Sequence, residues 1–313
     1  MIRLCGPAKS RLQARLPAPH RFSSCPTFCF FLLCGFSLSA EVVDIGVFGL
    51  FRPVELRVTP ASGPLLVTSG DARVELEGRQ SFSIRLGRFS GQVRVGARDG
   101  SATDFRLSVP GKIERQFHGT LVVRALPHKL QALVAMDREV AVASVVAAEM
   151  PATAPFEALK AQAVVARSYY AAGHDRHNGF EFCDTTHCQF LRAWPDAASP
   201  AFRATRDTRG LVLEYLGQPL AALYSASCGG QTRAFQDTGG EETGAYPYYS
   251  VACDFCRRHA PGVVHGHQLG LCQAGAAGMA ASGATFQAIL DHYLPGTAIF
   301  LLPPSPTLRH SND

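Results

Sequence analysis

The chain has little charge and no concentration of basic residues. Asp, Glu, Lys and Arg make up 18% of its 313 residues and apolar residues make up 47%, proportions typical of a globular protein with a buried core. Residues 1–40 hold five of the 30 basic residues and no acidic residue, so the remainder carries 25 of each sign. Because no basic stripe stands out, the sequence argues against nucleic-acid binding.

The sequence also lacks any long apolar run beyond its first 40 residues. That segment has a basic start, an apolar stretch at residues 28–38 and a small-residue site at Leu38-Ser39-Ala40. This order predicts a signal peptide, residues 1–40, cleaved near Ala40. The alternative is an uncleaved membrane anchor, for which the stretch is short. We therefore expect export to the periplasm, cell envelope or extracellular space, with no stable membrane span after cleavage.

The expected fold is α+β, with a β-rich N-terminal portion at residues 41–125. Apolar and polar residues alternate there in short segments separated by turn sequences such as Ser69-Gly70-Asp71, which predicts a half-buried antiparallel sheet. From residue 137 the periodicity becomes helical, and no internal repeat is found. The predicted elements are strands at 54–58, 72–76, 82–86 and 91–95, helices at 139–148, 156–172, 274–282 and 285–292, a hairpin at 210–224, an irregular segment at 237–262 and a disordered tail at 301–313.

Four soft metal ligands lie within twelve residues of one another. His177, Cys183, His187 and Cys188 are the residue types of a tetrahedral zinc site, and such a close run rarely arises from packing needs. Four protein ligands leave no open position for water, so this zinc would be structural. A Cys183–Cys188 disulfide is the alternative in an oxidising compartment. On spacing alone, His174 can replace His177.

A second cysteine set remains once the predicted signal peptide is removed. A CxxC pair with two single cysteines fits either a zinc site with four thiolates or two disulfides, and the sequence leaves both open. A redox-active CxxC lacks the expected thioredoxin-like βαβ context. The nearby His259 and His265 are interpreted as surface histidines. The four cysteines are Cys228, Cys253, Cys256 and Cys272.

One carboxylate, Glu149, interrupts an apolar run that ends at Pro151. Burial among residues 145–148 would raise its pKa, as a general acid requires. The alternative is a glutamate that ends a helix and bonds a nearby cation. Lys160 and Arg167 share one face of the second helix. They either support a site at the carboxylate or form structural ion pairs with residues such as Glu157.

Several motifs follow one another in a recognisable order. The first runs from Glu149-Met150-Pro151 to Arg167-Ser168-Tyr169, and the others lie at 188–189, 204–213, 224–232, 246–248, 266–276 and 289–297. Together they resemble the SpoIID/LytB family (stage II sporulation protein D and its relatives), over about residues 115–300. The resemblance implies a SpoIID-like catalytic region at residues 126–300.

The resemblance implies a secreted lytic transglycosylase that cleaves peptidoglycan glycan strands, preferably strands stripped of stem peptides. Such enzymes leave 1,6-anhydro ends. Glu149 takes the position of the catalytic acid/base, with Lys160, Arg167 and Tyr224 in support. A buried Tyr224 that bonds a backbone carbonyl is the alternative for that residue. The family's zinc ligands, where present, match His177, Cys183, His187 and Cys188.

The motif at residues 266–273 departs from the family pattern Gly-His-Gly-Val-Gly-Met-Ser-Gln. Gln268 replaces a glycine, which puts a backbone position that favours positive φ in question. Cys228 likewise occupies a position that is commonly serine. His267 and Gln273 match the pattern and are expected to contact substrate or support its site.

Two other functions stay open. A non-catalytic cell-wall binder that recruits or stimulates an amidase, as LytB-type relatives are thought to do, would keep the groove and the zinc without cutting glycan. A zinc hydrolase would instead use His267 and a cysteine-rich site. Structural zinc predicts unfolding on chelation, whereas catalytic zinc predicts loss of rate in a folded protein.

Overall fold

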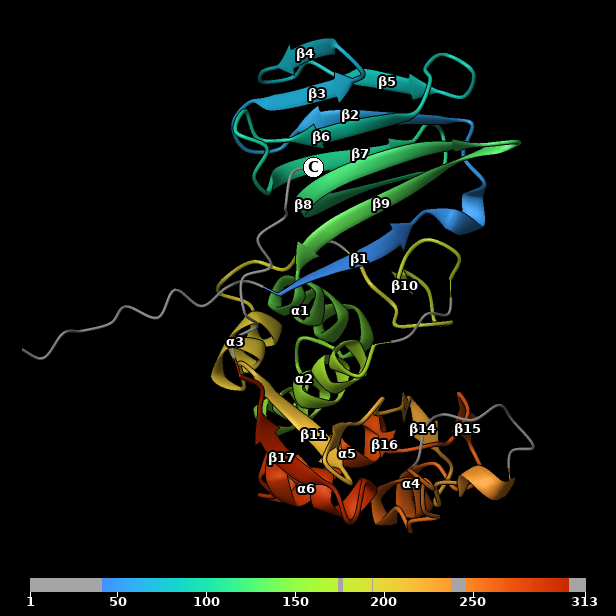
Figure 1. Ribbon diagram of the computed structural model, residues 1–313. Helices are drawn as coiled ribbons and strands as arrows, with labels where there is room; N and C mark the ends of the chain where they lie inside the picture. The colour runs from blue at the N-terminus through green and yellow to red at the C-terminus, as the bar shows by residue number, and fades with distance from the viewer. Residues whose placement is uncertain (1–40, 174–176, 193, 238–245, 304–313) are drawn as a thin grey trace, which may run out of the picture. The chain divides into compact units, whose positions relative to one another are not determined.

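A large N-terminal sheet is followed by a set of helices (Figure 1), which confirms the α+β expectation. The computed structural model describes residues 41–173, 177–192, 194–237 and 246–303. The predicted signal peptide, His174 and the tail from residue 304 onward lie outside the described residues. Among the helices that are described, none combines the length and the apolar character needed to cross a bilayer.

The sheet has ten strands, nine of which come from the N-terminal part of the chain. Its main path runs β10–β1–β9–β8–β6–β3–β4, and β7, β2 and β5 branch from β8. The predicted strands correspond to β2, β4, β5 and β6, whereas the others were not predicted. The bounds are β1 (Val42–Val47), β2 (Glu55–Pro60), β3 (Leu65–Ser69), β4 (Ala72–Leu76), β5 (Phe82–Arg85), β6 (Gln92–Gly96), β7 (Thr103–Val109), β8 (Ile113–Leu126), β9 (Lys129–Asp137) and β10 (Phe182–Cys183).

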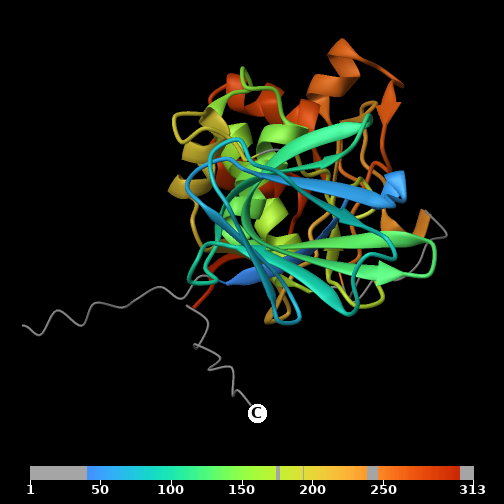
Figure 2. The same cartoon turned by 90° about the horizontal axis from the view of Figure 1, so that it is seen from above.

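The long strand β8 joins two groups of strands because its partners change along its length. Up to Gly119 it pairs with β7, and from Thr120 it pairs with β9, while β6 lies on its other side. A Cβ on Gly119 would lie 2.3 Å from the carbonyl oxygen of Ala135, so a larger residue would push β8 and β9 apart at this point. Figure 2 shows the strands of this sheet from above, where they differ in direction.

The four predicted helices lie close to their expected bounds, but α3 was not predicted and the short strands differ from the predictions. The segment expected to be irregular contains α4, the second half of the expected hairpin is divided between β12 and β13, and β17 reaches into the expected tail. The helices are α1 (Arg138–Glu149), α2 (Phe156–Ala171), α3 (Pro200–Asp207), α4 (Asp254–His259), α5 (Gln273–Ala281) and α6 (Phe286–Tyr293). The strands are β11 (Leu211–Tyr215), β12 (Gln218–Pro219), β13 (Tyr224–Ser225), β14 (Ser227–Cys228), β15 (Val264–His265), β16 (Leu271–Cys272) and β17 (Ala298–Leu301).

Local sequence sets both ends of α1. The Asp137 side chain accepts hydrogen bonds from the backbone N–H groups of Glu139 and Val140, at 2.7 and 3.3 Å, and so caps the first turn. At the other end Met150 is extended because it precedes Pro151. Glu149 is therefore the last residue of the helix.

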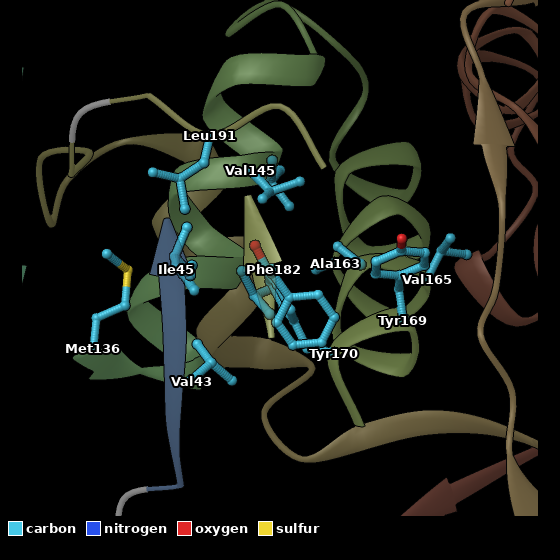
Figure 3. Packing of buried hydrophobic residues seen from close by; sticks show 14 of the residues in the cluster. Val43, Ile45, Met136, Val145, Ala163, Val165, Tyr169, Tyr170, Phe182 and Leu191 are labelled. Carbon is cyan, nitrogen blue, oxygen red and sulfur yellow. The ribbon is translucent and has the colours of Figure 1, made fainter. Parts of the chain in front are cut away.

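An apolar core connects the sheet to α1 and α2. Val43 and Ile45 of β1 lie in one buried cluster with Val145 of α1 (Figure 3). The ring of Tyr170 on α2 meets that of Phe182 on β10 edge to face, with centroids 4.7 Å apart. Because β10 pairs in parallel with β1, this packing fixes the middle of the segment that carries the first Cys/His group.

One buried ion pair ties three helices together. The guanidinium of Arg167 on α2 donates two hydrogen bonds of 2.7 Å to the two carboxylate oxygens of Glu139 on α1. It also donates to the carbonyl oxygen of Thr205 on α3, at 3.1 Å. Arg167 is 0% exposed, so loss of either charge would leave the other largely without water or a partner.

We expect Arg167→Met to lower the free energy of unfolding by about 3–5 kcal/mol, because it removes one member of a buried pair. The control is Lys160→Met on the same helix, which removes a more exposed pair with Glu157 and should cost about 1 kcal/mol or less. Urea unfolding followed by circular dichroism measures both. Equal losses in the two variants would contradict this account of how the helices are joined.

Candidate active site

Glu149 lies in a pocket formed by segments that are far apart in the chain. The cavity has a volume of about 400 Å³ and opens to solvent. Glu149 is the one acidic residue that lines it among the residues the structure describes. The lining residues are Glu149, Thr186, Cys188, Leu223, Tyr224, Ser225, Ala226, His265, Gly266, His267 and Gln273.

The Glu149 carboxyl group accepts hydrogen bonds from three separate segments. The backbone N–H of Phe190 and the hydroxyl of Tyr224 both donate to Oε1, each at 3.2 Å. The Gln273 side chain is a third donor. Because the first two donors share Oε1, the proton of the neutral acid is left to Oε2, the other oxygen.

Burial raises the pKa of Glu149 above its ordinary value, and the three donors only partly oppose this effect. The position at the C-terminal end of α1 acts in the same direction as burial, since that end of a helix carries partial negative charge. The immediate sequence neighbours contribute less than we expected, because Ala147 is exposed and Ala148 is half-buried. The desolvation comes instead from tertiary neighbours.

Tyr224 and Gln273 reach the carboxyl group because two short strands pair in parallel. Tyr224 on β13 lies opposite Leu271 on β16, and Gln273 follows β16 as the first residue of α5. Burial raises the pKa of Tyr224 well above its ordinary value, so the hydroxyl keeps its proton and can donate. The hydroxyl faces two side-chain oxygens, the Oε1 of Glu149 at 3.2 Å and the Oε1 of Gln189 at 3.4 Å, in place of the backbone carbonyl that the alternative interpretation required.

The motif with the altered glycine keeps the backbone conformation that a glycine would favour. Gln268 has φ of +64°. Its side-chain amide donates to the carbonyl oxygen of Cys228 at 2.9 Å, a bond that offsets part of the strain. The substitution therefore leaves the loop in place. Next to it, the Nδ1 of His267 accepts a bond from the N–H of Leu269, so its neutral ring carries the proton on Nε2.

Lys160 and Arg167 do not line the pocket, and each forms an ion pair away from it. Lys160 pairs with Glu157 at 2.7 Å, as the ion-pair alternative stated, and its ammonium lies over the Phe156 ring. Arg167 pairs with Glu139. Both cations are neutralised by carboxylates other than Glu149, so neither lowers the pKa of Glu149 directly.

The first Cys/His group fits a tetrahedral metal ion. The ligand atoms of His177, Cys183, His187 and Cys188 all lie within 4.8 Å of one another. A zinc ion with bonds of 2.0–2.3 Å would hold such atoms roughly 3.3–3.8 Å apart. The Sγ of Cys188 lies 3.2 Å from the Nε2 of His177 and 3.6 Å from the Nδ1 of His187. The observed separations are close to those that zinc requires.

A metal held here would close the loop that leads to Glu149. Cys183 belongs to β10, which pairs with β1, and Cys188 lines the pocket. The residue after next, Phe190, supplies the backbone N–H that bonds Glu149. With all four positions taken by protein the ion would be structural, and it would fix the direction of that N–H.

The second cysteine set is also brought together. Its four sulfur atoms lie within 4.8 Å of one another, and no disulfide joins any of the cysteines that the structure describes. His267 belongs to neither group, so the geometry does not favour a zinc hydrolase built on it. His259 is a surface residue as expected, whereas His265, also exposed, lies at the pocket rim.

Sequence reasoning missed two contributors to the site. Phe190 acts through its backbone N–H, which leaves no signal in the sequence. Ser225 is 4% exposed, lines the pocket, and its hydroxyl has no hydrogen-bond partner among the described residues. Its only signal was its place in a run of small residues between Tyr224 and Gly230, which indicated a turn.

Comparison with known proteins agrees with these motifs. Residues 127–215 match the SpoIID family, described as "Stage II sporulation protein". The chain contains a SpoIID domain. The matched range includes Glu149 and the first Cys/His group, but it ends before Tyr224 and the second cysteine set, and it is shorter than the expected range of 115–300.

A Bacillus subtilis (strain 168) protein named "Amidase enhancer" is similar to part of this SpoIID-domain protein. The two are 41% identical over 86 residues, which is 28% of this chain. The match spans only 12% of the relative's own length. The likeness supports common ancestry of that segment and leaves the activity of the whole chain to be argued from its site.

We expect Cys183→Ser to lower the zinc content by one ion per chain and to lower the melting temperature, because metal binding to the first Cys/His group contributes to folding. His128→Ala, at an exposed histidine outside both groups, is the control and should change neither quantity. Elemental analysis and thermal unfolding provide the measurements. Unchanged zinc in Cys183→Ser would contradict the assignment.

Proposed function

We propose that this SpoIID-domain protein is an exported lytic transglycosylase that cleaves peptidoglycan glycan strands, with Glu149 as its single general acid/base. The observation that carries the proposal is a half-buried carboxyl group of raised pKa at an open pocket that is lined by no other acidic residue among those described. Hydrolases of glycosidic bonds generally use two carboxyl groups. A transglycosylase needs only one, since the same group can act in both steps.

The proposed reaction returns Glu149 to its starting state. The protonated carboxyl donates its proton to the glycosidic oxygen as the bond from that oxygen to the sugar's C1 breaks. The resulting carboxylate then accepts the proton of the same sugar's 6-hydroxyl as that oxygen bonds C1. The products are a free hydroxyl on one fragment and a 1,6-anhydro sugar on the other, and no water is consumed.

The pocket walls offer hydrogen bonds suited to a sugar. The Nε2–H of His267 lies on the wall that carries Tyr224 and can donate to a sugar hydroxyl. Gly266 has no side chain, and a Cβ there would lie 3.0 Å from the Cβ of Ser225, so a larger residue would crowd this wall. No lysine or arginine lines the pocket among the described residues, which is consistent with a preference for strands without charged stem peptides.

A second candidate is a cell-wall binder that recruits or stimulates an amidase without cutting glycan. The name of the Bacillus subtilis relative, "Amidase enhancer", favours it. The same pocket would then hold a glycan while Glu149 served only as a hydrogen-bonding group. Product analysis separates the two functions, because only the first generates anhydro sugars in the absence of an amidase.

We expect Glu149→Gln to lower the rate of glycan cleavage roughly 10²–10⁴-fold, because the amide cannot donate and accept the proton. The measurement is mass spectrometry of anhydro-ended products from purified, peptide-free glycan strands. Glu114→Gln, at an exposed acid on β8, is the control and should retain activity. Equal product from wild type and Glu149→Gln would remove Glu149 from the mechanism.

We expect Tyr224→Phe to move the basic limb of the pH profile of kcat/KM to higher pH. The hydroxyl stabilises the ionised form of Glu149, so its removal raises the pKa of that carboxyl further. The protonated acid then persists to higher pH. Tyr249→Phe, at an exposed tyrosine outside the pocket, should leave the limb unchanged. A limb that moves to lower pH in Tyr224→Phe contradicts the assigned donor role.

A further inference from the structure

The four sulfur atoms of the second cysteine set lie together, next in the chain to residues that line the Tyr224 side of the pocket. Its members come from three places in the chain: β14, the N-terminus of α4, and the junction of β16 with α5. Their exposed fractions are 0–1%, and all four Sγ atoms lie within 4.8 Å of one another. The members are Cys228, Cys253, Cys256 and Cys272.

We propose that these four sulfurs bind one Zn²⁺ as a second, structural metal site with four thiolate ligands. Zinc–sulfur bonds of about 2.3 Å at tetrahedral angles place the sulfurs roughly 3.8 Å apart. The Sγ atoms of Cys256 and Cys272 are 3.5 Å apart. Cys253 and Cys256 have the CxxC spacing that commonly supplies two of four zinc ligands.

Hydrogen-bond donors already surround the sulfur atoms. The hydroxyl of Tyr293 donates to the Sγ of Cys253 at 3.2 Å, and the backbone N–H of Gly275 donates to the Sγ of Cys272 at 3.4 Å. Four thiolates and one Zn²⁺ leave a net negative charge in a buried place, and such a charge needs donors of this kind. Both donors come from the two C-terminal helices, α5 and α6.

A glycine allows α5 to approach this group. A Cβ on Gly275 would lie 1.8 Å from the hydroxyl oxygen of Tyr293 and 2.5 Å from the Sγ of Cys253. Neither atom can move away without breaking the bond between them. Only glycine therefore fits at position 275 without moving the Tyr293 hydroxyl or the Cys253 sulfur. Such a restriction is expected where four sulfur atoms must keep fixed positions.

Two disulfides explain the arrangement less well. A disulfide joins two sulfurs at about 2.05 Å and requires no approach of a second pair. Here all four sulfurs are mutually close, and no bond joins them. A redox-active CxxC needs an accessible thiolate, whereas Cys253 and Cys256 are 1% and 0% exposed.

The metal would fix one wall of the candidate active site. Ser225 and Ala226 line the pocket just before Cys228, and Gln273 lines it directly after Cys272. β14 pairs with β15, which carries His265 to the same rim. This inference concerns the metal alone and does not rest on glycan cleavage, so its test can fail or succeed independently of the proposed function.

The first test uses the wild-type chain expressed in zinc-supplemented medium. We expect two zinc ions per chain and, after unfolding with chelator but without reductant, alkylation of all four cysteines by mass spectrometry. Protection of these cysteines until a reductant is added would overturn the proposal, because it would show disulfides.

The second test isolates the new site in Cys183→Ser, which lacks one ligand of the first group. We expect one zinc ion to remain, with X-ray absorption that fits four sulfur ligands at about 2.3 Å and no nitrogen. Absence of zinc, nitrogen in the ligand sphere, or iron in place of zinc would each overturn the assignment.

Two variants report on the site itself. Cys256→Ser should lose one zinc ion relative to wild type. Gly275→Ala keeps all four ligands, so we expect it to fold around the metal but to lose one zinc ion to a chelator faster than wild type. His128→Ala should match wild type in both measurements. Equal metal loss in Gly275→Ala and His128→Ala would contradict the tight fit described here.

Discussion

The protonation of one carboxyl group places the main demand on this structure. Burial at the end of a helix raises the pKa of Glu149, yet three hydrogen-bond donors stabilise its ionised form. The pKa stays raised only while the desolvation of the carboxyl group outweighs these donors and while no cation comes close. Small displacements of the surrounding segments would change both conditions, so those segments have to be held firmly.

The donors come from parts of the chain that have little regular structure of their own. Phe190 lies in a loop, Tyr224 in a two-residue strand, and Gln273 at the start of a helix that follows another two-residue strand. Such segments are usually mobile unless something ties them down. Each is next to one of the two groups of sulfur and imidazole ligands. A metal ion in the first group would close the loop before Phe190, and one in the second would join the segments on either side of the Tyr224 wall.

The two cations of α2 are each paired with a carboxylate other than Glu149. Arg167 and Lys160 lie on the helix next to Glu149, but each is paired with its own carboxylate, Glu139 or Glu157. A free guanidinium or ammonium beside Glu149 would lower the pKa of that carboxyl and favour the ionised form. The same pairs stabilise the helices, so one arrangement serves both the fold and the proposed chemistry.

The sequence alone determined the elements that depend on local interactions. α1 and α2 were predicted because their periodicity and the breaking Pro151 act within a few residues. The first Cys/His group was predicted because its ligands lie close together in the chain. The roles of Lys160 and Arg167 were decided only by the tertiary structure, since a shared helix face does not say which neighbour each cation meets. The same holds for the backbone N–H of Phe190, which any residue could supply, and for the second cysteine group, whose members are up to 44 residues apart in the numbering. Their proximity results from strand pairing and helix packing, which bring distant segments together and which no short stretch of sequence encodes.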